Sequence, residues 1–204
     1  MSGRIKQGSN LQANLKKRLF ILGGLATLSG VLPRKTNAQV SPVNSGDPAF
    51  WLQPRSVAVR NMNTGQRGEF VYWRDGKYVM NDYYALCALG LDHHENKAMQ
   101  IAPQVFDLMF ATQAWYFGVE RKRTEHELTS AYRTPATNFA VGGAPSSLHQ
   151  SGRAADGRLK GVSVGVYAAM LREFKAGGVG VYGNHVHWDV GRAPTFWHGG
   201  RREV

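Results

Sequence analysis

Two short apolar runs near the end of the chain constrain its fold more than any other segment. Residues 179–182 and 185–189 are separated only by Gly183-Asn184. Such a two-residue link between alternating runs is typical of a tight β-hairpin. Alternation places every second residue of the second run on one face, which gathers three polar side chains there: His185, His187 and Asp189. The sequence therefore predicts an antiparallel sheet with one polar face.

A histidine and an aspartate precede this hairpin, at positions 149 and 156. Two imidazoles and one carboxylate form a three-ligand zinc set that leaves a coordination position open. Neighbouring same-face residues of a strand lie roughly 6.6 Å apart, so His185 and His187 need not bind the same ion. One of them can be a ligand while the other stands beside the open position. Asp189 is placed to orient a ligand imidazole.

The other histidines and the cysteine favour structural interpretations. His93-His94 is followed by charged and polar residues, which indicates a solvated turn rather than a second metal cluster. His126 lies between two glutamates and is interpreted as part of a solvated charged stretch. Cys87 is the single cysteine, so no intramolecular disulfide or multi-thiolate zinc site can form. Its apolar neighbours predict a small buried residue.

Residues 1–38 have the pattern of a secretory signal peptide. A basic Lys16-Lys17-Arg18 group precedes an uncharged apolar run over 19–32, and Ala38 offers a small residue before a cut. The run is shorter than the roughly 20 residues that a membrane-spanning helix needs. We therefore expect an exported protein of the periplasm or cell envelope. An uncleaved leader would be its one contact with a membrane.

The net charge of +11 would suggest an anionic partner such as nucleic acid, but its distribution argues against one. Residues 1–38 hold seven basic residues and no acidic one, which leaves a net of only +4 beyond them. A mildly basic body is ordinary. We therefore predict no nucleic-acid partner, and the sequence leaves the oligomeric state open.

Beyond the leader, the chain divides into four further segments. Residues 39–55 are interpreted as a linker, 56–80 as an N-terminal β-hairpin region, 81–198 as the main domain, and 199–204 as a tail. Within the main domain, helices are expected near 82–89, capped by Asn81 or Asp82, and over 102–117 and 163–176. A strand is expected over 128–132 and a loop over 133–148.

Two motifs together carry a family resemblance over roughly residues 100–197. They are Ser147-x-His149-x-x-Gly152-x-Ala154-x-Asp156 and His185-x-His187-x-Asp189. This combination resembles the zinc D-Ala-D-Ala carboxypeptidases, which form one superfamily with lysostaphin-type endopeptidases and the hedgehog domain. An exported bacterial branch is the most similar; three further segments match it: 130–133, 178–182 and 186–191.

The resemblance implies an α+β fold in which a small antiparallel sheet, flanked by helices, carries the metal site. It implies Zn²⁺ as cofactor and peptidoglycan stem peptides as substrate and partner. Its implied ligands are His149, Asp156 and His187. Arg133 would bind a peptide carboxylate or polarise the scissile carbonyl, and Ser147 would support the loop of the first histidine.

One position departs from part of the family. Some members carry a glutamate as general base three residues before the last histidine, where this chain has Asn184, which cannot accept a proton. Other members use the first histidine of His-x-His, which implies His185 as the base. The leading hypothesis is a zinc peptidase that hydrolyses amide bonds in peptidoglycan stem peptides or cross-links. The alternative is a zinc-containing cell-wall binding module without turnover.

Overall fold

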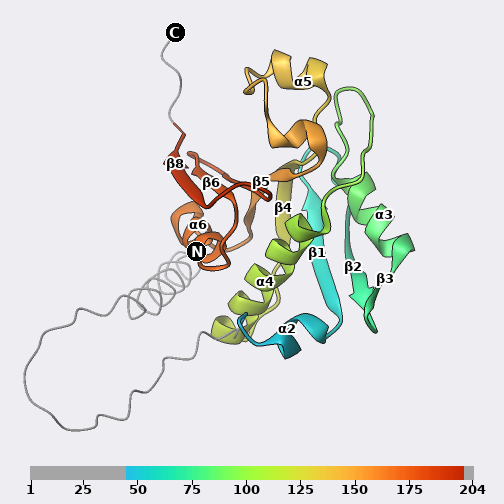
Figure 1. The fold of residues 1–204 in the computed structure, drawn as a ribbon, viewed down its shortest axis with the longest axis vertical. Helices are drawn as coiled ribbons and strands as arrows, with labels where there is room; N and C mark the ends of the chain where they lie inside the picture. Colours follow the sequence, from blue (N-terminus) through green and yellow to red (C-terminus); the bar gives the residue numbers. More distant parts are fainter. Residues whose placement is uncertain (1–44, 200–204) are drawn as a thin grey trace, which may run out of the picture.

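The computed structural model describes residues 45–199, and one eight-stranded sheet runs through this part of the chain (Figure 1). The strand order is β3-β2-β1-β4-β5-β7-β6-β8. The strands are β1 Arg55–Asn61, β2 Arg67–Arg74, β3 Lys77–Tyr78, β4 His126–Ser130, β5 Ala154–Leu159, β6 Gly178–Val181, β7 Val186–Asp189 and β8 Thr195–His198.

The predicted α+β class is confirmed, and the predicted hairpin is present. β6 and β7 pair antiparallel, and the Tyr182 amide donates to the His185 carbonyl at 3.0 Å across the Gly183-Asn184 turn. The sheet is larger than expected and mixed, because β1 pairs parallel with β4 and β6 pairs parallel with β8. The 56–80 region belongs to this same sheet, since β1 joins it to the strands of the 81–198 region.

The described residues form five α-helices and one short 3₁₀ helix. They are α2 Pro48–Leu52, α3 Met80–Leu89, α4 Pro103–Glu120, α5 Pro135–Ala140, η1 Leu148–Ser151 and α6 Val164–Glu173. Pro103 begins α4, where a missing amide hydrogen costs nothing. Ser163 caps α6 by accepting from the Val166 amide. The predicted cap of α3 is wrong: Val79 precedes the helix, and the Asp82 carboxylate accepts the Val71 amide of β2 instead.

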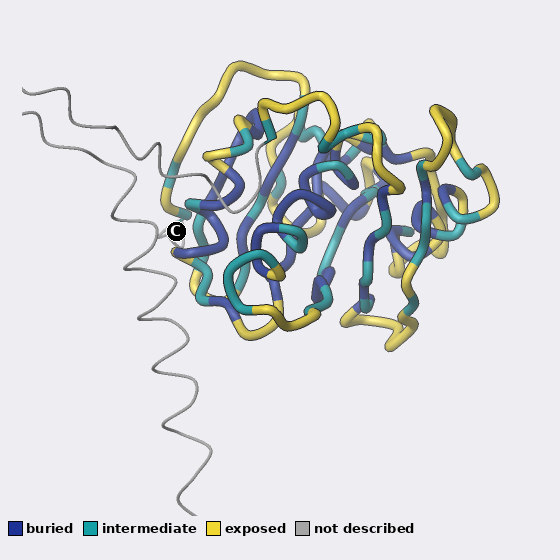
Figure 2. Tube along the Cα trace, turned by 90° about the horizontal axis from the view of Figure 1, so that it is seen from below, coloured by how far each residue is buried: buried dark blue, intermediate teal, exposed yellow. Residues whose placement is uncertain are grey.

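Helices α4 and α6 pack against one face of the sheet and against each other. Tyr167 of α6 contacts Trp188 of β7 at a ring-centroid distance of 5.7 Å, so the side chains that alternate with Trp188 face away from these helices. Figure 2 shows the buried segments gathered in the middle of the molecule and the exposed ones in the connecting loops. The polar positions of β7 therefore lie on the face that α4 and α6 leave uncovered.

His126 corrects the interpretation of residues 125–127 as a solvated stretch. Its side chain is fully buried, and its Nε2 lies 3.0 Å from the Met109 carbonyl oxygen of α4. Burial lowers its pKa from 6.5 to about 4, against a smaller opposite effect of the Met109 hydrogen bond. The two flanking glutamates misled the prediction, because alternation on β4 turns the central residue inward.

The 133–148 segment also differs from the expected loop, because it contains α5. Pro135 begins this helix, and the Thr134 hydroxyl accepts the Thr137 amide as its cap. The buried Asp92 carboxylate accepts the Thr134 amide at 2.8 Å and thereby joins the 91–97 turn to α5. His93 and His94 are exposed in that turn, as expected.

Cys87 is buried and free, as predicted, and burial raises its pKa. In the expected 39–55 linker, residues 48–52 form α2, whose Phe50 ring stacks on Phe110 of α4. The predicted leader over 1–38 and tail residues 200–204 lie outside the described residues. Among the described residues, no helix is both long and apolar enough to cross a membrane.

Candidate metal centre

Directly paired residues form a row across five neighbouring strands, and this row positions the site. Asp156 of β5 pairs with His187 of β7, which pairs with Gly180 of β6. Ser130 of β4 extends the row beyond Asp156, and Trp197 of β8 extends it beyond Gly180. Paired residues lie on the same face of a sheet. The row therefore brings together side chains that are up to 67 positions apart in the sequence.

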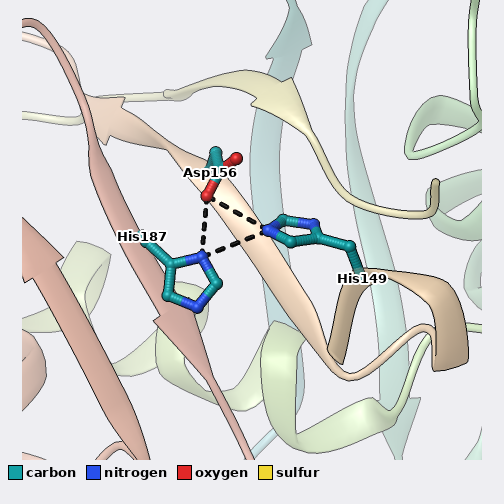
Figure 3. Close-up of side chains that lie close together, drawn as sticks. All are labelled: His149, Asp156 and His187. Carbon is teal, nitrogen blue, oxygen red and sulfur yellow. Dashed lines mark hydrogen bonds and ion pairs between the residues drawn. The ribbon is translucent and has the colours of Figure 1, made fainter. Parts of the chain in front are cut away.

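The third polar group of the site comes from η1, which lies beside the row. His149 is buried, and the Arg133 amide donates to its carbonyl oxygen. Its Nε2 lies 3.1 Å from Nδ1 of His187 and 3.2 Å from Oδ1 of Asp156, while Nδ1 of His187 lies 2.9 Å from the same oxygen (Figure 3). Within the described residues, this is the one group of three side chains placed to hold a metal ion.

Nε2 of His149, Nδ1 of His187 and Oδ1 of Asp156 form a triangle. A hydrogen bond on the far side of each imidazole determines which of its nitrogens faces this triangle. Nδ1 of His149 donates to the Ala131 carbonyl oxygen at 2.6 Å, which leaves a lone pair on Nε2. Nε2 of His187 donates to Oδ2 of Asp189 at 3.1 Å, which leaves a lone pair on Nδ1. Two nitrogen lone pairs and a carboxylate oxygen thus converge on one point. Three such acceptors repel one another unless a cation, either a proton or a metal ion, lies among them.

The carboxylate of the triangle is held ionised. Burial would raise the pKa of Asp156, but the neighbouring His149 and His187 imidazoles and the charge of the Arg133 guanidinium outweigh this effect, so the pKa falls well below its ordinary value. Arg133 donates to Oδ2 of Asp156, and Ser130 accepts from Nε of the same arginine at 2.8 Å. Arg133 therefore turns Oδ1 toward the two histidines, a contact that the sequence did not indicate.

The donor set fits zinc in chemistry and in size. Zinc binds histidine nitrogen and carboxylate oxygen at about 2.0–2.2 Å, so two ligands of a tetrahedral ion lie about 3.3–3.6 Å apart. The three edges of the triangle, 2.9, 3.1 and 3.2 Å, are only slightly shorter. Three protein ligands leave the fourth tetrahedral position open, which is the arrangement of catalytic rather than structural zinc sites.

Asp189 lies where the sequence predicted and makes more contacts than expected. Its buried carboxylate accepts the Gly178 amide on Oδ1 at 2.7 Å, and Arg192 contacts Oδ2 at 2.9 Å beside the His187 contact. Hydrogen bonds to His187 and Gly178 outweigh the opposite effect of burial and lower its pKa. Ser147 precedes η1 and contributes backbone hydrogen bonds to Ala144 and Gln150, with no side-chain cap.

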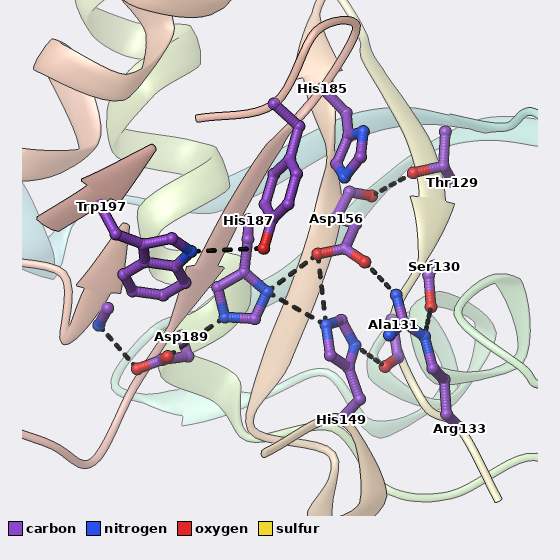
Figure 4. Close-up of polar contacts among 12 residues, drawn as sticks. Thr129, Ser130, Ala131, Arg133, His149, Asp156, His185, His187, Asp189 and Trp197 are labelled. Atoms are coloured by element: carbon purple, nitrogen blue, oxygen red, sulfur yellow. Dashed lines mark hydrogen bonds and ion pairs between the residues drawn. The ribbon is translucent and has the colours of Figure 1, made fainter. Parts of the chain in front are cut away.

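His185 lies on the same side of the row as the triangle, with its ring directed toward Asp156 (Figure 4). Its Nδ1 lies 2.8 Å from Oδ1 of Asn184, so the amide oxygen accepts the Nδ1 hydrogen and Nε2 keeps its lone pair. Burial lowers the pKa of His185, and the attraction of Asp156 opposes this effect only partly. Asn184, the position that departs from part of the resembled family, thus supports the histidine that would replace the missing glutamate.

This site lies on the sheet face that α4 and α6 leave uncovered, within an α+β fold. Its residues define the protein as a candidate single-metal hydrolase. The chain belongs to the peptidase family described as peptidoglycan L,D-endopeptidase MepK, whose family model matches residues 50–196. The peptidoglycan L,D-endopeptidase MepK of Escherichia coli K12 is 28% identical over 185 residues, which cover 87% of this chain and 94% of that protein. The probable peptidoglycan L,D-endopeptidase MepK of Haemophilus influenzae is 30% identical over 193 residues, 90% of this chain and 96% of that protein.

The sequence did not indicate the contribution of β8. Trp197 lies against the metal-site histidine, with 5.3 Å between its ring centroid and that of His187. Its Nε1 donates to the Tyr182 hydroxyl at 3.2 Å. β8 pairs parallel with β6, and a parallel neighbour leaves no tight-turn signal in the sequence.

Proposed function

We propose that this protein is an exported, zinc-dependent peptidase that hydrolyses amide bonds of peptidoglycan peptides, as an L,D-endopeptidase. Two observations carry the proposal. Nε2 of His149, Nδ1 of His187 and Oδ1 of Asp156 converge on one point. The His185 ring is directed toward Asp156, and its Nε2 keeps a free lone pair. Membership of the MepK family and the names of the two relatives support the substrate class and the endopeptidase assignment. The leader pattern over 1–38 supports export to the periplasm or cell envelope.

His149, Asp156 and His187 would hold the zinc ion through the atoms that form the triangle. Bound zinc supplies Lewis acidity, which polarises a carbonyl group and lowers the pKa of water toward neutrality. Asp189 keeps Nδ1 of His187 free of its proton by accepting the hydrogen on Nε2. Ala131 does the same for His149 through its carbonyl oxygen.

His185 is proposed as the general base. Its Nε2 accepts a proton from the attacking water, and the same nitrogen returns the proton to the leaving amine when the peptide bond breaks. The lowered pKa of His185 keeps its ring neutral, and therefore able to accept a proton, at neutral pH. Arg133 is fixed by Asp156 and Ser130, and its guanidinium group is proposed to stabilise negative charge on the scissile carbonyl oxygen.

Mass spectrometry of purified muropeptides incubated with the zinc-loaded protein tests the proposal. We expect new peptide termini at an L,D bond with the wild type, and none with His185→Ala, which should still bind one zinc ion. An unchanged muropeptide profile at stoichiometric zinc would contradict the enzyme and favour the cell-wall binding module. Cleavage by His185→Ala at the wild-type rate would contradict the assignment of the base.

A further inference from the structure

The proposed base lies at the end of a turn, where side chains are held weakly. Asn184, its hydrogen-bond partner on Nδ1, is exposed to solvent and sits in the turn itself. A general base must be held in line with the proton that it accepts, and a misplacement of about 1 Å can cost about 100-fold in rate. The orientation of His185 therefore depends on whatever else contacts its ring.

The ring of Tyr182 makes that contact. The rings of Tyr182 and His185 stack with centroids 4.6 Å apart and planes only 3° from parallel. The two residues face each other across the hairpin turn, where the Tyr182 amide donates to the His185 carbonyl oxygen. A flat aromatic neighbour at this distance limits rotation of the imidazole about its χ2 bond.

The far end of Tyr182 is fixed in turn. Its hydroxyl oxygen accepts a hydrogen bond from Nε1 of Trp197, and the indole ring lies beside His187. Trp197 comes from β8, one of the two edge strands of the sheet. The tyrosine ring is thus held at its base by the hairpin and at its tip by a neighbour that also contacts a proposed zinc ligand.

Two glycines leave the space that these rings occupy. A Cβ at Gly180 would lie 2.5 Å from Cε2 of Trp197, and a Cβ at Gly199 would overlap the Tyr182 ring. Neither glycine has a positive φ, so the backbone conformation does not require glycine at these positions. Glycine is required at both positions because a Cβ there would clash with the ring of Trp197 or of Tyr182. The chain therefore leaves space for both rings in their observed places.

We propose that Tyr182, held by Trp197, is a positioning residue that fixes the His185 ring with Nε2 toward the metal centre. β8 thereby takes part in the proposed active site without providing a metal ligand. This inference rests on the proposed function, because it assigns a partner to the proposed base. It gives a role to Tyr182 and Trp197, which are neither proposed zinc ligands nor the proposed catalytic residues.

Kinetics of substituted proteins test the inference on the full chain with purified muropeptides. Tyr182→Ala removes both the stack and the hydrogen bond, and we expect kcat to fall about 100-fold with KM and zinc stoichiometry unchanged. Tyr182→Phe removes the hydrogen bond, keeps the stack and should lower kcat about 10-fold. Trp197→Phe removes the same hydrogen bond together with the indole contact to His187, so its kcat should fall at least as far. Because the hydrogen bond is shared, the double variant should be no slower than Trp197→Phe alone.

Phe196→Leu is the matched control, because Phe196 is the β8 neighbour of Trp197 and alternates to the other face, where Arg172 lies 4.4 Å from its ring centroid. We expect wild-type kcat from this variant. A second readout does not depend on turnover: the ¹H–¹⁵N signal of the His185 Nδ1 hydrogen should be sharp in the zinc-loaded wild type and broadened by exchange in Tyr182→Ala.

The outcomes separate this inference from the function on which it rests. If the wild type cleaves and Tyr182→Ala cleaves equally fast, the positioning role is refuted while the peptidase remains. If kcat falls only because zinc is lost, Trp197 acts through His187 and the positioning role is likewise refuted. If the wild type neither cleaves nor binds zinc, the proposed function fails and takes the inference with it.

Discussion

Replacing Asp189 with Asn tests how far the metal centre depends on the carboxylate behind His187. The wild-type side chain is fully buried and uses both oxygens: Oδ1 accepts the Gly178 amide, and Oδ2 accepts His187 and contacts Arg192. Asparagine has the same shape but only one oxygen. In either orientation its NH₂ group would face a donor, either the Gly178 amide or the His187 and Arg192 pair.

Losing this support should weaken zinc binding about 10- to 100-fold, which corresponds to about 1.4–2.7 kcal/mol. The donor left without a partner should also destabilise the metal-free protein by about 1–3 kcal/mol. Competition with a fluorescent zinc chelator measures the first effect, and urea unfolding of the metal-free protein measures the second.

Asp82→Asn is the matched control, because Asp82 also accepts a backbone amide, from Val71, but lies outside the triangle and its partners. We expect this variant to keep wild-type zinc affinity and most of its stability, because the one oxygen of asparagine can still accept the Val71 amide. Wild-type zinc affinity in a folded Asp189→Asn protein would refute the argument that Asp189 sets the tautomer of His187.

Three further predictions follow from other contacts. Gly180→Ala should destabilise the protein by about 1–3 kcal/mol in urea unfolding, because its Cβ would lie 2.5 Å from Trp197; unchanged stability would show that the indole moves freely. The pKa of His126 is 6.5 in the unfolded chain and about 4 in the folded protein, where the ring is buried. The free energy of unfolding should therefore be highest above pH 6.5 and fall by about 3 kcal/mol as the pH drops to 4. Urea unfolding of wild type and His126→Gln at several pH values checks this, since only the wild type should show that loss. A strong chelator should abolish peptide cleavage and added zinc should restore it; cleavage that survives complete zinc removal would contradict the metal assignment.

The parts of the fold that sequence patterns predicted are those with local signals. The Gly183-Asn184 link predicted the hairpin, and alternation along its second strand placed His187 and Asp189 on one face, where they are in contact. The helical spacing of apolar residues over 163–176 predicted α6, which spans Val164–Glu173. Each of these features depends on residues that are close in the sequence.

The parts that were missed depend on distant partners. Parallel pairing of β1 with β4 and of β6 with β8 joins segments whose connections carry no turn signal. His126 was misjudged because its charged neighbours are visible in the sequence, whereas its burial under α4 and α6 is not. The role of Arg133 as a partner of Asp156 likewise depends on the register of β4 against β5.

The glycines of β6 show how one register can determine both packing and chemistry. Gly178 and Gly180, together with Tyr182 just after the strand, alternate onto the face of the candidate metal centre. The first two leave room for Asp189 and Trp197, which contact His187 from two sides, and the third stacks on His185. A side chain at either glycine would displace a group that contacts a proposed zinc ligand. A shift of β6 by one residue against β7 would instead turn Val179 and Val181 toward the metal centre. The register of this strand is therefore as necessary to the site as the ligands, although β6 provides none of them.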